Sequence, residues 1–224
     1  ARRSIVLLKN ESLLPVDTRK FKKILVTGPN ANNQSIMGDW VFEQPEKNVS
    51  TILEGIKEEA SGTQINYVDV GWNMRALDSA KIEEAIQTAK SSDLAIVIVG
   101  EDSFRQHWKE KTCGENRDRM DITLWGKQDY LVESIYKTGV PTIVILINGR
   151  PLATRWIAEN IPAVIEAWEP GSMGGKAIAE ILFGKVNPSG KLPITIPRHV
   201  GQISTVYNHK PSQFLHPYID GDKT

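Results

Sequence analysis

The stretch LAIVIVGEDSFRQHWKEKTCGENRDRMDITLW (residues 94–125) determines the fold and points to one loop. Its first part, LAIVIVG (Leu94–Gly100), is the most apolar run of the chain and predicts a strand buried on both faces. Ligands of α/β proteins lie beyond the carboxyl ends of the strands, and loops this long are usually functional or disordered. We therefore expect the chemistry in residues 101–125, among the acids Glu101, Asp102, Glu110 and Glu115.

Outward from this strand, apolar strands alternate with amphipathic helices. Further strands are predicted at 24–27, 65–70, 142–149 and 163–168, and helices at 51–60, 81–90, 128–138, 153–159 and 174–183. Thr51 and Glu54 match a capping box at the start of one helix. The alternation predicts an α/β protein: a three-layer α/β/α sandwich with a mostly parallel sheet of about five to six strands.

The two ends of the chain carry weaker patterns. Residues 1–9, with Ile5, Leu7 and Leu8 apolar, suggest a short helix, and residues 192–196 suggest an edge strand. We expect one domain over residues 1–224, with an irregular tail at 198–224. The chain begins without Met, so we also expect a fragment from which any upstream signal sequence is missing.

Composition argues against several classes of protein. The chain has 224 residues, 40% of them hydrophobic, which suits a globular domain with a real core. Its 27 basic and 27 acidic residues leave no positive excess for nucleic acid. No apolar run approaches the ~20 residues that a membrane span requires. The single Cys113 excludes an internal disulfide and a multi-cysteine metal site.

Motifs for cofactors are also missing from the sequence. The first strand ends in T-G-P-N instead of a dinucleotide fingerprint, GSMGG (residues 171–175) has the wrong spacing, and no phosphate-binding P-loop is present. The four histidines, His107, His199, His209 and His216, lack paired metal-ligand spacing, and no G-x-S-x-G elbow occurs. We expect no cofactor and no metal.

The acidic loop allows two interpretations. Glu115 lies in the charged segment C-G-E-N-R-D-R. Because loops are normally polar, these charges could simply form solvated ion pairs on the surface. A carboxyl at the end of a strand can also act as a general acid/base. The aromatic His107, Trp108 and Trp125 favour a sugar site, to which Trp40 and Phe42 could add a wall, although either could belong to the core.

A resemblance to a known family supports a sugar site in this loop. Residues 149–198, GRPLATRWIAENIPAVIEAWEPGSMGGKAIAEILFGKVNPSGKLPITIPR, resemble the second domain of glycoside hydrolase family 3. So do SIVLLKNESLLP (4–15), GPNANNQSIMGDW (28–40), GENRDRMDITLWGKQ (114–128) and VYNHKPS (206–212), in the same order. The resemblance covers essentially the whole chain.

The resemblance implies a retaining, exo-acting β-glycosidase, most often a β-glucosidase or β-xylosidase, that is periplasmic or secreted. In this family an N-terminal barrel supplies the aspartate nucleophile, and the α/β sandwich supplies the acid/base glutamate. That glutamate matches Glu115, with Glu101 as the alternative, and Trp40 and Phe42 match an aromatic position beside the aglycone. The resemblance also implies that this chain and the N-terminal barrel of the same protein together bind an oligosaccharide or β-glycoside. We expect the chain to be inactive without that barrel.

Two other functions remain open. The chain could be a non-catalytic module that binds carbohydrate or a partner protein, and appreciable affinity for cellobiose or glucose would favour that. A flavodoxin-like nucleotide binder is disfavoured by the missing phosphate loop. Without its barrel, we expect the loop to lack order between Ser103 and Arg117.

Overall fold

The computed structural model describes residues 1–202. Most of the expected tail, His209, His216 and the VYNHKPS segment lie outside the described residues. In chain order the elements are β1 (Val6–Asn10), β2 (Lys23–Thr27), η1 (Gln34–Met37), η2 (Glu46–Asn48), α1 (Ile52–Glu59), β3 (Gln64–Val68), α2 (Ser79–Lys90), β4 (Leu94–Gly100), η3 (Arg105–His107), α3 (Gln128–Tyr136), β5 (Thr142–Ile147), α4 (Arg155–Asn160), β6 (Ala163–Glu166) and α5 (Gly174–Leu182).

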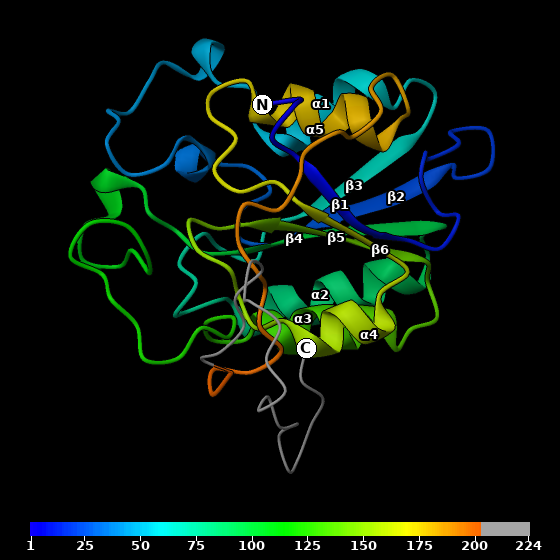
Figure 1. Ribbon diagram of the computed structural model, residues 1–224. Coiled ribbons are helices and arrows are strands. Elements are labelled where there is room, and N and C mark those ends of the chain that lie inside the picture. The colour runs from blue at the N-terminus through cyan, green and yellow to red at the C-terminus, as the bar shows by residue number, and fades with distance from the viewer. Residues whose placement is uncertain (203–224) are drawn as a thin grey trace, which may run out of the picture.

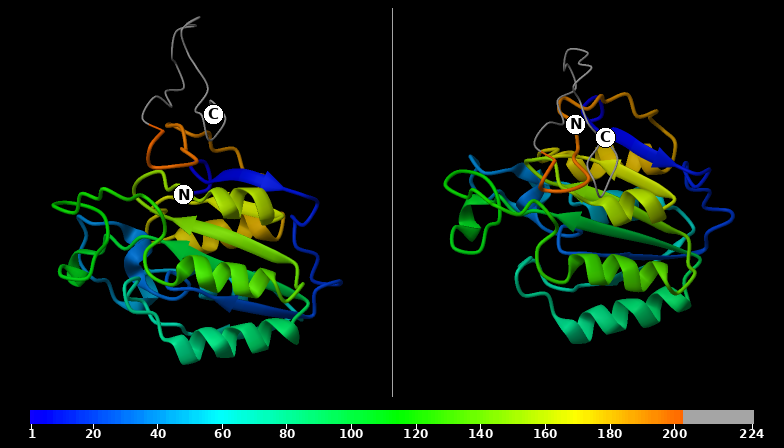
Figure 2. Two further views of the ribbon diagram at one scale, coloured as in Figure 1. Left: turned by 90° about the horizontal axis from the view of Figure 1, so that it is seen from below. Right: turned by 60° about the horizontal axis from the view of Figure 1, so that its bottom comes forward.

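One sheet forms the middle layer of this part of the chain. It has six strands in the order β1-β6-β5-β4-β2-β3, all parallel to their neighbours except β1, which runs antiparallel to β6. Helices α1 and α5 cover one face, and α2, α3 and α4 cover the other (Figures 1 and 2). The predicted three-layer sandwich with a mostly parallel sheet is therefore confirmed.

Strand β4 is central because it is apolar on both sides. All seven of its residues are buried. Successive side chains of a strand point to opposite faces, and β4 accordingly divides its side chains between two cores. Leu94, Ile96 and Ile98 pack with α1 and α5, whereas Ala95, Val97 and Val99 pack with the helices of the other face.

The chain order creates a crevice at the carboxyl edge of the sheet. After β2 the chain passes through α1 to β3 on one side, and α2 then brings it back to β4 on the other side. The direction of strand addition therefore reverses between β2 and β4, which is where α/β sheets bind ligands. The loops that follow these two strands lie near each other at the left of Figure 1.

Two glycines allow both strands to end beside this crevice. Gly28 follows β2 with φ 114° and Gly100 ends β4 with φ 149°, backbone conformations that disfavour residues with a Cβ. A Cβ on Gly28 would lie 2.0 Å from the carbonyl oxygen of Ile98, and one on Gly100 would lie 1.9 Å from that of Ile147. Each loop therefore departs where a neighbouring strand backbone passes too closely for any side chain.

The prediction of a helix at residues 1–9 was wrong. A turn precedes β1, which pairs with β6 along the edge of the sheet. Leu7 packs against one core and Leu8 against the other, an arrangement that suits a strand. The partner strand, more than 150 residues away in sequence, supplies the hydrogen bonds that decide the conformation.

The prediction of an edge strand at 192–196 was also wrong. These residues form bends and irregular backbone, and the side chains of Leu192 and Ile196 line a groove with Leu8, Arg155 and Ala158. The position next to β6 at this edge of the sheet is taken by β1.

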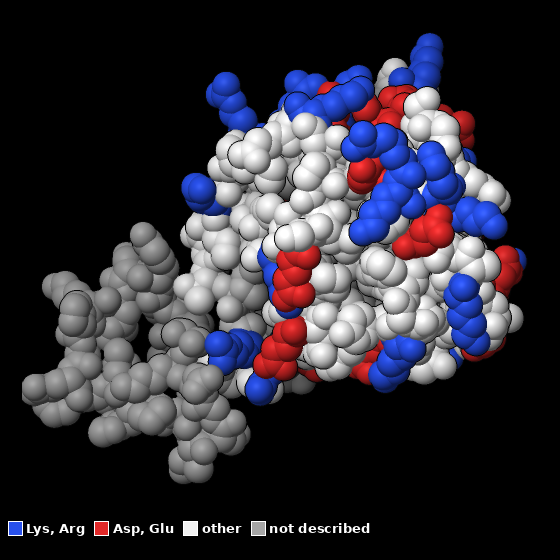
Figure 3. Space-filling view, turned by 90° about the vertical axis from the view of Figure 1, so that its right-hand side faces the viewer, with Lys and Arg blue, Asp and Glu red and all other residues white. Residues whose placement is uncertain are grey.

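The face opposite the crevice is charged but mixed. Viewed from the right-hand side of Figure 1, Lys and Arg side chains lie among Asp and Glu side chains (Figure 3). None of the described helices is both long and apolar enough to cross a membrane.

Candidate active site

The loop after β4 is folded, contrary to the expected lack of order. The Asp102 carbonyl accepts hydrogen bonds from the amides of Thr112 (2.7 Å) and Cys113 (3.2 Å), which closes the loop on itself. The Asp102 carboxylate accepts the Phe104 amide at 2.9 Å and lies 2.6 Å from Nδ1 of His107. The loop thus builds its own polar core on the buried Asp102, without a neighbouring domain.

The base of the loop is held to the sheet by amide side chains. Gln128 accepts the Gly100 amide at 2.8 Å and donates to the Gly100 carbonyl at 3.0 Å. Asn30, from the loop after β2, donates to the Glu101 carbonyl at 3.0 Å. The two loops of the crevice are therefore joined at their bases.

Glu101 is enclosed at this base. Its side chain is fully buried, with Nη1 of Arg119 2.9 Å from one oxygen and Nε of Arg150 3.2 Å from the other. The Arg119 contact is a hydrogen bond, whereas the Arg150 contact is an ion pair without hydrogen-bond alignment. Burial raises the pKa of Glu101, and the two guanidinium groups act in the opposite direction. Glu101 therefore acts as an ionic anchor.

The same two arginines hold the backbone near Glu115. Nη2 of Arg119 donates to the Thr123 carbonyl at 2.7 Å, and Nη2 of Arg150 donates to the Arg117 carbonyl at 2.8 Å. Glu101 is thus connected, through its partners, to the segment that carries Glu115.

Glu115 lies at the outer end of the loop, and 39% of its side chain is exposed. One carboxylate oxygen is 3.1 Å from Nη1 of Arg105. Its amide donates to Asp39 at 2.6 Å. Asn116 follows with φ 57°, a left-handed conformation that Asn tolerates better than most residues. The backbone therefore turns sharply here and leaves the Glu115 carboxylate on the surface.

Asp39 joins the two loops across the crevice. It comes from the loop after β2, and only 9% of its side chain is exposed. Besides the Glu115 amide, it accepts hydrogen bonds from Nζ of the fully buried Lys111 at 2.9 Å and from Nη1 of Arg105 at 3.3 Å. Burial by itself would raise the pKa of Asp39, but these donors together hold that pKa below its ordinary value.

The expected aromatic residues surround this cluster. Trp40 and Phe42 are 73% and 81% exposed, and Trp108 is 39% exposed. The guanidinium of Arg105 lies 3.9 Å from the ring centre of Trp40 and 5.3 Å from that of Trp108. Trp40 and Trp108 are therefore brought together with Glu115 through Arg105, whereas none of the ring contacts in residues 1–202 joins Phe42 to them.

Two further carboxyls lie behind the crevice. Glu166, at the end of β6, is 1% exposed, accepts the Trp168 amide at 2.9 Å and the Asn148 side chain at 3.1 Å, and burial raises its pKa to about 7. Glu169 accepts a hydrogen bond from the Ser103 hydroxyl, and burial raises its pKa as well. Glu166 is enclosed by protein and cannot reach a substrate outside the fold, whereas Glu169 is half-buried and is held by Ser103.

The sequence analysis did not single out Asp39, Arg105 or Lys111. A signal for Asp39 was present, because the loops after the first and third predicted strands had to leave the same edge of a parallel sheet. Nothing in the local pattern distinguished Arg105 and Lys111 from the other basic residues of the loop. Their role follows from contacts that only the folded loops create.

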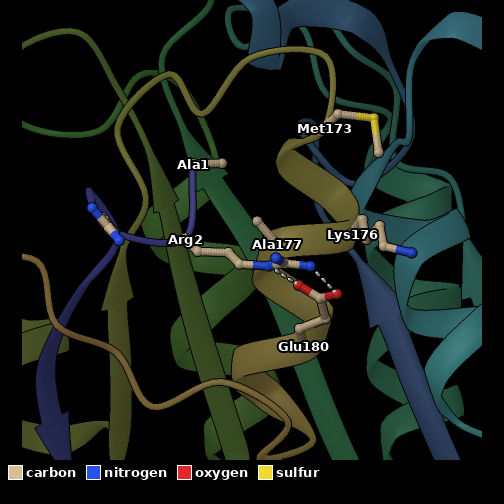
Figure 4. Close-up of a pocket in the computed structure, with 7 residues that line it drawn as sticks. Ala1, Arg2, Met173, Lys176, Ala177 and Glu180 are labelled. Carbon is tan, nitrogen blue, oxygen red and sulfur yellow. Dashed lines mark hydrogen bonds and ion pairs between the residues drawn. The ribbon is translucent and has the colours of Figure 1, made fainter.

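Neither a metal cluster nor a pocket beside α5 competes with this site. In residues 1–202, no group of three or more His, Cys, Asp or Glu side chains is arranged to hold a metal ion. A pocket beside α5 is lined by Arg2, Met173, Lys176 and Glu180 among others, and there Arg2 is paired with Glu180 (Figure 4). The Glu180 carboxylate is therefore already paired with a cation.

Comparison with known proteins identifies the family. The model of the "Glycosyl hydrolase family 3 C-terminal domain" matches residues 5–223. A β-xylosidase of Formosa agariphila is 41% identical over 94% of this chain and 29% of its own length. A periplasmic β-glucosidase of Salmonella typhimurium is 35% identical over 98% of this chain and 32% of its own length. The chain thus spans about a third of these relatives.

Solved structures agree with the sequence relatives. A β-glucosidase from Erythrobacter marinus is 34% identical, with a TM-score of 0.80 over 98% of this chain and 32% of that one. A β-glucosidase from Listeria innocua in complex with isofagomine is 29% identical, with a TM-score of 0.82 over 98% of this chain and 30% of that one. With the sandwich, its topology and nearly the whole length matched, the chain belongs to the glycosyl hydrolase family 3 C-terminal domain family.

Proposed function

We propose that this chain is the domain of a retaining, exo-acting β-glycosidase that supplies the general acid/base, Glu115. In the first step, neutral Glu115 gives its proton to the glycosidic oxygen while a carboxylate nucleophile bonds to the anomeric carbon. In the second step, ionised Glu115 takes a proton from the water that displaces that nucleophile.

The contrast between Glu115 and the buried acids carries this proposal. A general acid must come within hydrogen-bond distance of the substrate oxygen. Glu115 is at the switch-point crevice with 39% of its side chain exposed, whereas Glu101 is fully buried between two arginines. The exposed carboxylate can therefore meet a sugar held by another domain, and the buried one cannot do so without breaking two ion pairs.

The nucleophile is proposed to be an aspartate of an N-terminal barrel in the same polypeptide. Retention requires the two carboxyls to be about 5–5.5 Å apart. Asp39, Glu101 and the half-buried Glu169 are each held by partners within the chain. We therefore expect the isolated chain not to hydrolyse glycosides.

The proposed substrates are oligosaccharides and β-glycosides with a terminal non-reducing glucosyl residue; a xylosyl residue is the alternative. Relatives named β-glucosidase and β-xylosidase support this range. Exposed Trp40 and Phe42, with Trp108, fit an aromatic wall beside the leaving group, because sugar rings stack on aromatic faces.

The proposed location is the periplasm or the outside of the cell, because one relative is named a periplasmic β-glucosidase. Cell fractionation tests this location.

The test is Glu115→Gln in the full-length enzyme, assayed on aryl β-glucosides with poor and very acidic leaving groups. We expect kcat/KM for the poor leaving group to fall by ~10²–10⁴, with the acidic leaving group largely spared. Glu110→Gln, on the same loop, is the matched control and should change neither rate. Equal loss on both substrates would refute the assignment.

The alternative Glu101 is tested in the same assay. Because its role here is structural, Glu101→Gln should lower both rates by a similar factor and also lower the unfolding temperature. A selective loss on the poor leaving group would instead transfer the acid role to Glu101.

A non-catalytic carbohydrate-binding module is the second candidate, favoured by the exposure of Trp40 and Phe42. Calorimetric titration of the isolated chain with cellobiose and glucose separates the two proposals. Appreciable affinity supports the module, and its loss in Trp40→Ala would locate the binding surface. If neither sugar gives a measurable heat of binding, the result supports the proposal that this chain carries half of an enzyme site.

A further inference from the structure

Arg105 occupies an unusual position in the crevice. Its Nη1 atom is 3.3 Å from Oδ1 of Asp39 and 3.1 Å from Oε2 of Glu115, so one cation serves two carboxylates from different loops. Its guanidinium also lies over the ring of Trp40 at 3.9 Å and near that of Trp108 at 5.3 Å. The planar group is therefore fixed by two aromatic rings as well as by two anions.

The two carboxylates differ in how much else holds them. Asp39 also accepts Nζ of Lys111 and the Glu115 amide, and it is 9% exposed. The Glu115 carboxylate is held by the side chain of Arg105. Asp39 thus serves as the fixed anion that keeps Arg105 in place, and Arg105 in turn contacts the exposed Glu115 carboxylate.

We propose that Arg105 is a positioning residue that orients the Glu115 carboxylate. The inference rests on the proposed role of Glu115 as the general acid/base. The Nη1 contact at 3.1 Å fixes one oxygen of the Glu115 carboxylate, and the anion and the aromatic ring that hold Arg105 fix that contact in turn.

The other charged groups at this site are few. From the loop after β2, Asp39 faces the Glu115 amide. From the segment around η3, Arg105 contacts Glu115 itself, and Lys111 reaches it only through Asp39. On the Glu115 segment, Arg117 turns toward Trp108, donating to its carbonyl, with its guanidinium 5.2 Å from the ring centre. Among the described residues, Arg105 is thus the cation in direct contact with the Glu115 carboxylate.

The experiment compares kcat/KM of the full-length enzyme on aryl β-glucosides with poor and very acidic leaving groups. Arg105→Gln and Arg105→Met should lower the rate on the poor leaving group by about 10-fold and largely spare the acidic one, because only the poor leaving group needs a well-oriented proton donor. Arg105→Lys keeps a cation at this position and should recover part of the loss. Lys109→Gln removes an exposed cation from the same loop and should change neither rate.

If the rate falls equally on both leaving groups in the two neutral variants, Arg105 is merely structural and the inference is overturned. If instead Glu115→Gln spares turnover on poor leaving groups, it is the proposed function that fails.

Discussion

Glu101 and Glu115 lie on one loop but in opposite environments. Glu101, at the base, is fully buried and paired with Arg119 and Arg150. Glu115, at the outer end, is 39% exposed and shares Arg105 with Asp39. The comparison shows how one loop holds two carboxylates differently: the buried one fixes the backbone, and the exposed one is the group to which we assign proton transfer.

The largest expected effect is a loss of stability when the buried Glu101 is replaced. Glu101→Ala leaves Arg119 and Arg150 without their shared anion in a buried site, which should cost about 3–5 kcal/mol of unfolding free energy. Glu115→Ala removes an exposed partner and should change that free energy by less than ~0.5 kcal/mol. Urea unfolding of both variants measures the difference. Similar losses in the two would show that the outer end is as firmly built as the base.

The next effect concerns a second enclosed carboxyl, Glu166. Its pKa of about 7 in the fold, against 4.5 as the ordinary value, means that the folded state binds more protons between these pH values. Stability should therefore fall as pH rises from about 4.5 to about 7, by about 3 kcal/mol in total, and stay level above that range.

Glu166→Gln is uncharged at every pH and should lose this part of the pH dependence. Denaturant midpoints at several pH values provide the measurement. Glu58→Gln, on an exposed part of α1, is the control and should retain the decline. A Glu166→Gln variant that keeps the full decline would mean that another group causes it.

The smallest effects compare glycines at the two ends of the loop. Gly100→Ala places a Cβ 1.9 Å from the Ile147 carbonyl, where the β5 backbone cannot yield, and should cost at least about 1–3 kcal/mol. Gly114→Ala meets the Asp39 carboxylate at 2.6 Å, a side chain rather than a strand backbone, and should cost about 1–2 kcal/mol.

Thermal and urea unfolding rank the two glycine variants, and activity of the full-length enzyme adds a second distinction. Gly114→Ala should lower the rate by more than its stability loss suggests, because Asp39 also receives the Glu115 amide. If Gly114→Ala proves the more destabilising of the two, then the outer end of the loop is the more rigid one.

Local composition was sufficient for much of the fold. Leu94–Gly100 contains only apolar residues and glycine, and nothing but a doubly covered strand hides both of its faces. The capping box is equally local: Thr51 accepts the Glu54 amide at 3.3 Å, and Glu54 accepts the Thr51 amide at 2.9 Å. Such features were predictable because every atom involved lies within a few residues.

Other features depend on distant partners. Residues 6–10 form a strand because β6 offers an edge, and no signal within the first ten residues reveals that. Glu101 could not be separated from Glu115 as acid/base candidate by sequence, because neither the pattern nor the charge shows which carboxylate Arg119 and Arg150 enclose. Burial and pairing are properties of the assembled loop.

The sequence by itself determined the alternating elements, the buried central strand and the loop in which to look, since periodicity and polarity act over short distances. Only the tertiary structure decided which carboxylate is enclosed, and that Asp39 meets the Glu115 amide across 76 positions of chain. The physical reason is that electrostatic and hydrogen-bond energies depend on distance in space, which the order of residues does not specify.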